Sequence, residues 1–129
     1  MNEIRFKGDV LTPSLALYSV TDFMGEDKFG LALELLDGEG FPYTTLTVSF
    51  GEFIGMKNAA YIDSNNNPKE LIDAVVEAGW MQDTGFTKAS GFCTYPLYLF
   101  DEQFLMSVDP DVYREYSGQY EDFEREMSR

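Results

Sequence analysis

The chain has 129 residues, of which 23 are acidic and nine basic, and its formal net charge at pH 7 is −14. The length suits one folded domain, and an aromatic content of 16% is far above that of a disordered acidic tail. The charge disfavours direct binding to nucleic-acid backbones and anionic lipids, and the absence of histidine excludes histidine metal sites and His-dependent triads.

The sequence favours a reducing compartment. Cys93 is the single cysteine, so no internal disulfide can form. No apolar run approaches the roughly 20 residues of a membrane span, and residues 1–5 do not begin a secretory signal. We therefore expect a cytoplasmic protein, with Cys93 as a small buried core residue.

Alternating apolar residues predict an antiparallel hairpin early in the chain. Leu15 and Leu17 belong to a strand that ends at residues 21–23, residues 24–28 form a turn, and residues 29–36 return as the second strand. The glycine-rich residues 37–40 end that strand. A further half-buried strand is predicted for residues 43–50, with one apolar and one polar face (Leu46, Val48 and Phe50 against Thr45, Thr47 and Ser49), and a short strand for residues 59–62.

Local capping chemistry predicts a helix over residues 68–78. Asn67 can cap the first turn, Pro68 takes the first helical position, Glu70 completes a capping box and Gly79 supplies the stop. The face predicted to dock on the rest of the domain carries four apolar residues: Leu71, Ile72, Val75 and Val76.

The second half of the chain is predicted to add two strands and a helix. The strands cover residues 80–87 and 92–100, and Pro96 predicts an edge or a bulge in the second of them. Asp109 and Pro110 begin a C-terminal helix that runs to Met127, with Gly118 as a weak point. The whole chain, residues 1–129, is therefore predicted to be a single α+β domain with a mainly antiparallel sheet, a short central helix and a C-terminal amphipathic helix.

Two motifs that resemble ligand sites fail on inspection. Residues 63–67 begin like a calcium loop, but Pro68 and Ala74 stand where the turn glycine and the bidentate glutamate should be. Residues 38–43 begin like a dinucleotide fingerprint but lack its third glycine and precede a strand. With 23 carboxylates, some will be neighbours by chance. We predict no catalytic residue, no cofactor and no metal, and hence a protein that is not an enzyme.

The C-terminal helix carries an aromatic stripe at spacings of three and four residues: Tyr113, Tyr116, Tyr120, Phe123 and Met127. The favoured interpretation is that this stripe packs on the domain's own sheet. The alternative is a protein interface, because interface anchors are enriched in aromatic residues. The same choice between core and binding surface applies to Tyr95, Tyr98 and Phe100.

Acidic residues gather in two stretches of the chain. The first hairpin carries one, which includes Asp22, and residues 101–129 contain nine acids against three bases. Solvated faces are one interpretation, and a single negative field that steers a basic partner is the other. The candidate partner-binding residues are Glu26, Asp27, Glu34, Asp37, Glu39, Glu115, Tyr116, Glu121, Asp122, Glu124 and Glu126.

Three motifs in order resemble a small bacterial family, domain of unknown function 4313. They are residues 43–49 (YTTLTVS), 61–68 (YIDSNNNP) and 90–100 (SGFCTYPLYLF), with an additional segment at residues 51–56. The resemblance covers about residues 40–101. It implies an origin in plasmids, integrative elements or prophages, and it implies no activity and no catalytic residue.

Two functional hypotheses follow. The first is a non-catalytic anti-defence inhibitor, an anti-CRISPR or anti-restriction protein whose carboxylates imitate DNA phosphates in the basic channel of a nuclease. The second is an accessory protein-interaction module of conjugation or plasmid maintenance that binds through the aromatic C-terminal helix or a sheet edge. Both predict a basic or peptide partner and neither involves direct nucleic-acid or membrane binding.

Overall fold

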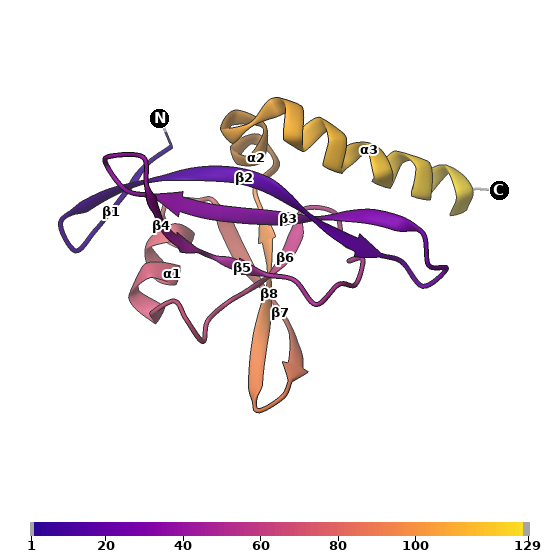
Figure 1. Cartoon of the computed structure of the whole chain (residues 1–129), viewed down its shortest axis with the longest axis horizontal. Helices are drawn as coiled ribbons and strands as arrows, with labels where there is room; N and C mark the ends of the chain where they lie inside the picture. The colour runs from indigo at the N-terminus through magenta and orange to yellow at the C-terminus, as the bar shows by residue number, and fades with distance from the viewer. Residues whose placement is uncertain (1, 128–129) are drawn as a thin grey trace.

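The computed structural model describes residues 2–127, and side chains within residues 2–121. The predicted α+β class is confirmed: two antiparallel four-stranded sheets are combined with three helices (Figure 1). The first sheet has the order β1 (Ile4–Phe6), β2 (Asp9–Thr21), β3 (Asp27–Leu36), β4 (Pro42–Thr45). The second has the order β5 (Thr47–Val48), β6 (Ala59–Ile62), β8 (Cys93–Phe100), β7 (Met81–Ser90). The helices are α1 (Lys69–Glu77), α2 (Glu102–Val108) and α3 (Pro110–Met127).

The first sheet is dominated by the long hairpin of β2 and β3. Leu15 lies opposite Leu33 and Leu17 opposite Leu31, so their side chains share one face, on which Leu15, Leu31 and Leu33 are buried. The hairpin was predicted, but β2 begins at Asp9, well before the predicted strand. Strand β1 was missed because it is only three residues long and is held by its pairing with β2.

The predicted strand over residues 43–50 is wrong as a single element. The chain pairs with β3 as β4, then passes to the second sheet as β5. At the junction the Leu46 N–H donates to the Leu33 carbonyl (2.9 Å) and the Leu33 N–H donates to the Thr47 hydroxyl (3.0 Å). Leu46 and Thr47 are therefore both buried, which breaks the predicted alternation of an apolar and a polar face.

Helix α1 ends as predicted but begins differently. Gly79 has φ +82° and its N–H donates to the Val76 carbonyl, while the Trp80 N–H donates to the Val75 carbonyl, the pattern of a Schellman stop. The prediction that Asn67 caps the helix is wrong: its buried side-chain amide donates to the carbonyls of Thr45 and Asp63.

The docking face of α1 is narrower than predicted. Leu71, Ile72 and Val75 are buried, whereas Val76 is 37% exposed.

Strands β7 and β8 form a hairpin that projects from the rest of the molecule (Figure 1). Its turn lies at Gly91 and Phe92, later than the predicted loop, because β7 extends to Ser90. The predicted irregularity near Pro96 is found in the partner strand, as a shift of register in β7 between Asp83 and Thr87. Cys93 lies on this hairpin and is only half-buried, so its predicted place in the core is wrong.

The end of the chain contains one helix that was predicted and one that was not. Helix α3 begins at Pro110, with the Asp109 carboxylate accepting the Val112 N–H (3.1 Å), and continues through Gly118. Helix α2 was missed, although the Asp101 carboxylate caps it through the Phe104 N–H. Over the residues that the structure describes, no helix combines the length and apolar character that crossing a bilayer requires.

Candidate partner-binding surface

The acids of the first hairpin lie in two separate groups. Glu26 and Asp27 lie at the turn between β2 and β3, whereas Asp37 and Glu39 lie in the loop after β3. Strand β3 has ten residues, which span about 30 Å at 3.3 Å per residue. Because the Debye length at physiological salt is about 8 Å, the two groups do not act as one field. Glu34, half-buried, lies between them on β3, opposite Ser14 and Thr45.

Around Gln119, helix α3 lies beside β3, near the turn between β2 and β3. The Gln119 side chain accepts from the Phe29 N–H (2.8 Å) and donates to the Phe29 carbonyl (2.9 Å), so this part of α3 lies beside β3 near Asp27. Glu121 is exposed two residues further along the helix, a spacing that turns its side chain away from the face that carries Gln119. Glu115 is exposed about one turn before Gln119. The side chains of Asp122, Glu124 and Glu126 lie outside the described residues.

Asp22 and Asp37 have the same structural role in two loops of the same design. The Asp22 carboxylate accepts the N–H groups of Met24 (2.9 Å) and Glu26 (3.0 Å). The Asp37 carboxylate accepts those of Glu39 (2.9 Å) and Phe41 (3.0 Å). A glycine with positive φ follows three residues after each aspartate, as in hairpin loops that combine a type I turn with a bulge. Asp37 is therefore accounted for as a turn residue.

Tyr116 belongs to the core and not to a surface. It is 1% exposed, and Tyr113 and Tyr120 beside it are also buried, so the favoured interpretation of the aromatic stripe is confirmed for these three residues. The alternative, in which Tyr116 contacts a partner, is wrong because its neighbours already cover it. Phe123 and Met127 carry side chains outside the described part of the chain.

The three tyrosine hydroxyls fasten α3 to the segment before β6. The Tyr116 hydroxyl accepts the Asn58 N–H (2.9 Å) and donates to the Tyr120 hydroxyl (3.1 Å), which donates to the Ile54 carbonyl (2.6 Å). The Tyr113 hydroxyl donates to the Asn58 side chain (2.7 Å). Burial raises the pKa of Tyr120 to about 12 and raises those of Tyr113 and Tyr116 further. These hydroxyls are neutral, structural groups at physiological pH.

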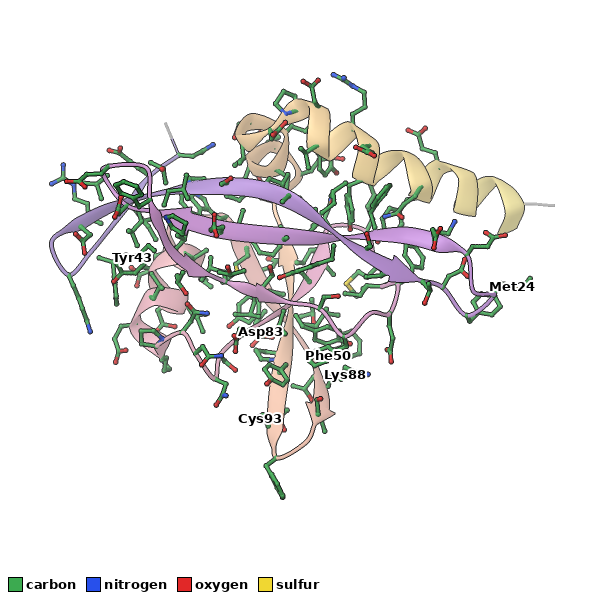
Figure 2. The ribbon with its side chains drawn as sticks, viewed as in Figure 1. Met24, Tyr43, Phe50, Asp83, Lys88 and Cys93 are labelled. Atoms are coloured by element: carbon green, nitrogen blue, oxygen red, sulfur yellow. The ribbon has the colours of Figure 1, made fainter. Side chains whose placement is uncertain are left out.

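A cavity of about 480 Å³ lies beside the turn between β2 and β3. It is lined by six residues: Thr21, Asp22, Phe23, Glu52, Phe53 and Gly55. Phe23 is 91% exposed and Met24, the next residue, is 70% exposed; Met24 is labelled at the tip of the hairpin in Figure 2. Below, this cavity is called the tip pocket. No sequence pattern predicts it, because its two walls, residues 21–23 and 52–55, are far apart along the chain.

Two backbone hydrogen bonds join the two walls of the tip pocket. The Thr21 N–H donates to the Gly51 carbonyl (3.0 Å), and the Phe53 N–H donates to the Thr21 carbonyl (2.9 Å). Under the pocket the Phe53 ring packs on the Tyr120 ring, with 5.3 Å between centroids. The pocket is therefore a preformed feature of the fold.

Two lysines lie close to the tip pocket. Lys28 is 3.8 Å from the Glu26 carboxylate and 5.9 Å from the centroid of the Phe53 ring. Lys88 is 3.2 Å from the Glu52 carboxylate and also lies over the Phe50 ring, and Figure 2 shows Phe50 and Lys88 near each other. With Asp22 and Asp27 counted, this end of the molecule carries four carboxylates and two ammonium groups.

The hairpin of β7 and β8 has a different surface. Phe86 is 61% exposed and Phe92, at the turn, is fully exposed. Residues 84–100 contain no acidic residue, in a chain that has 23. Tyr95 is half-buried against Phe50 (5.2 Å between centroids), Tyr98 is half-buried, and Phe100 is in the core. The sequence marked Tyr95, Tyr98 and Phe100 as core or binding surface, but it did not single out the exposed Phe86 and Phe92. This hairpin of β7 and β8 carries one acid and one base, Asp83 and Lys88, and is called the neutral arm below.

The loop that resembled a calcium site is a turn. The Asp63 carboxylate accepts the Asn66 backbone N–H (3.2 Å) and side-chain amide (2.8 Å). Within the described part of the chain, no group of three or more Cys, Asp or Glu residues is placed to hold a metal ion.

These features define a class of protein: a compact acidic α+β domain with two antiparallel sheets, a preformed pocket at one hairpin tip and a projecting neutral hairpin. The chain belongs to the family described as "Domain of unknown function (DUF4313)", whose model matches residues 17–120. The match is wider than the region from which the resemblance was drawn. No curated protein and no solved structure gives a match to this chain.

Proposed function

We propose that this protein is a non-catalytic binding protein that uses the acidic end of the β2–β3 hairpin to occupy a basic surface of another protein. In its specific form, the partner is a nucleic-acid channel of a defence nuclease, and the protein is an anti-CRISPR or anti-restriction inhibitor that acts as a DNA mimic. An origin in a mobile genetic element, which the family resemblance implies, is part of this proposal.

The observation that carries the proposal is the combination of exposed apolar residues and carboxylates at one tip. Phe23 and Met24 are exposed beside Glu26 and Asp27. Exposed aromatic residues and methionine are enriched at protein interfaces, and the surplus of negative charge attracts a basic partner over a long range. Nuclease channels hold DNA through Lys and Arg, so such a tip can compete for them without any chemistry.

Charge reversal at the tip tests the proposal. In a bacterium with an active CRISPR or restriction system, the wild-type protein should protect a targeted plasmid. Reversing Glu26, Asp27 and Glu52 to lysine should reduce this protection by more than about tenfold, because close charge pairs across an interface carry much of its affinity.

The matched control reverses three exposed acids away from the tip, Glu3, Glu39 and Glu77, which changes the net charge by the same amount. This control should retain protection. Equal loss in both variants would show that overall charge, and not the tip, is responsible. No protection against any nuclease by the folded wild-type protein would contradict the inhibitory function itself.

A second candidate function is the accessory protein-interaction module, and the neutral arm favours it. Strand β7 is the last strand in the order of the second sheet, so its outer edge can accept an added strand from a partner. Phe86 and Phe92 lie exposed on the same arm. In this case serine substitutions at Phe86 and Phe92 should abolish partner binding, whereas the lysine substitutions at the acidic tip should leave it intact.

A further inference from the structure

We propose that the tip pocket binds an arginine side chain of the basic partner. The inference rests on the proposed function and names the group that the acidic tip would recognise. An arginine side chain fits the pocket because its walls combine aromatic rings with carboxylates, the two kinds of group that a guanidinium group contacts together.

The aromatic contribution comes from Phe23. Its ring lines the pocket and is 91% exposed, so a planar cation can stack on it without displacing other side chains. The second ring, Phe53, already has the Lys28 ammonium 5.9 Å from its centroid. The protein's own Lys28 thus lies against the Phe53 ring, whereas the exposed Phe23 ring can accept a cation from a partner.

The carboxylates supply the charge that selects a cation. Asp22 and Glu52 line the pocket from its two segments of chain, with Glu26 and Asp27 close by along the hairpin. Glu52 is paired with Lys88, but the Glu52 side chain is 69% exposed, and ion pairs open to solvent contribute little free energy. Glu52 can therefore exchange Lys88 for a guanidinium group, which binds carboxylates in a bidentate geometry that an ammonium group cannot match.

The backbone of the pocket is held in place by hydrogen bonds, which lowers the entropic cost of binding. The backbone of Thr21 is hydrogen-bonded to that of Gly51 (3.0 Å) and Phe53 (2.9 Å). The Asp22 carboxylate accepts two N–H groups of its own loop, which hold it in place. Because the backbone of both walls is fixed before a partner arrives, only the exposed Phe23 and Glu52 side chains have to be ordered on binding. Its volume of about 480 Å³ is within the range of ordinary ligand pockets.

The test uses fluorescein-labelled nona-arginine and nona-lysine peptides, with fluorescence anisotropy as the measurement. The wild-type protein should bind nona-arginine at least about threefold more tightly than nona-lysine, because stacking favours the guanidinium group. Phe23→Ala and Glu52→Gln should each weaken the binding of nona-arginine by about fivefold and reduce the preference for arginine.

Matched controls come from the second loop of the same design. Phe41 is 62% exposed and Glu39 is exposed, so Phe41→Ala and Glu39→Gln remove the same groups at the other end of β3. Both should bind nona-arginine within about twofold of the wild type, because exposed sites outside the pocket contribute little. Circular dichroism and thermal unfolding confirm that each variant is folded.

The outcomes separate this inference from the proposed function. Equal affinity for the two peptides, equal effects of Phe23→Ala and Phe41→Ala, or no binding of nona-arginine would each overturn the arginine pocket, while plasmid protection would still stand or fall on its own assay. Selective loss in Phe23→Ala and Glu52→Gln would support the pocket even if no nuclease were inhibited.

Discussion

Removing a single hydroxyl from the buried tyrosine network should measurably destabilise the protein. In Tyr116→Phe the Asn58 N–H loses the oxygen that accepts it at 2.9 Å, and the Tyr120 hydroxyl loses one donor but keeps its own bond to the Ile54 carbonyl. An unsatisfied buried donor costs about 1–3 kcal/mol. Tyr116 is 1% exposed, so water cannot easily replace the hydroxyl, and we expect a loss of about 2 kcal/mol.

Urea denaturation followed by circular dichroism measures this loss. The midpoint should fall while the m-value stays unchanged, because the surface exposed on unfolding is the same. The melting temperature should fall by about 7 °C, since 1 kcal/mol corresponds to 3–4 °C in a domain of this size. The control is Tyr43→Phe, which removes the same hydroxyl from a side chain that is 39% exposed and should change stability by less than about 0.5 kcal/mol.

A loss below about 0.5 kcal/mol in Tyr116→Phe, or a loss equal to that of Tyr43→Phe, would refute the reasoning, since an unpaired buried donor should cost more. It would mean that the Asn58 N–H finds another acceptor when the hydroxyl is absent. The hydrogen bonds between α3 and the segment before β6 would then be a consequence of packing and not a source of stability.

Two further predictions concern pH and the helix glycines. In the folded protein the pKa of Tyr120 is raised to about 12 and that of Tyr116 is also raised, both above the unfolded value of 10.0. As the pH rises, the unfolded chain therefore loses these protons before the folded protein does. The stability that these hydroxyls contribute is full below pH 10 and is lost as the pH rises above it. Between pH 10 and 12 the free energy of unfolding should decrease by about 1.4 kcal/mol per pH unit for each tyrosine. Urea titration at each pH measures this decrease, and Tyr116→Phe should show a smaller slope. A free energy of unfolding that does not change with pH would contradict the burial of these hydroxyls. Gly79→Ala should destabilise by about 1 kcal/mol because φ is +82° there, although no atom lies within 4 Å of the added methyl group. Gly118 lies in the interior of α3, and no atom lies within 4 Å of a methyl group added there either. Gly118→Ala should therefore stabilise the protein by about 0.5–1 kcal/mol. If the melting temperatures of the two variants shift in the same direction, backbone conformation does not decide these effects.

Short-range chemistry explains the parts of the fold that the sequence predicted well. Gly79 ends α1 because its positive φ allows the Schellman bonds. Asp109 and Pro110 begin α3 because the carboxylate accepts an N–H of the first turn. In each case the interacting groups lie within a few residues of one another, so the sequence contains the whole interaction.

The candidate site was predicted less well, because its parts meet only in three dimensions. The sequence contains the acids and the exposed phenylalanines, but it does not show that β3 separates Glu26 from Glu39 by its full length. The sequence also does not show that a backbone hydrogen bond joins Phe53 to Thr21 and so brings the two walls of the tip pocket together. The chain's surplus of carboxylates predicted a binding surface, and the tertiary structure shows which carboxylates lie together.

By itself, the sequence determined the α+β class, the boundaries set by local caps and turns, and the negative charge, because these depend on residue type and on near neighbours. Only the tertiary structure decided that the chain changes sheets at Leu46, that the Asn67 amide serves β4 and not α1, and that Tyr116 is core. The physical reason is that each of these outcomes depends on hydrogen bonds or burial against residues more than 12 positions away, which no local pattern encodes.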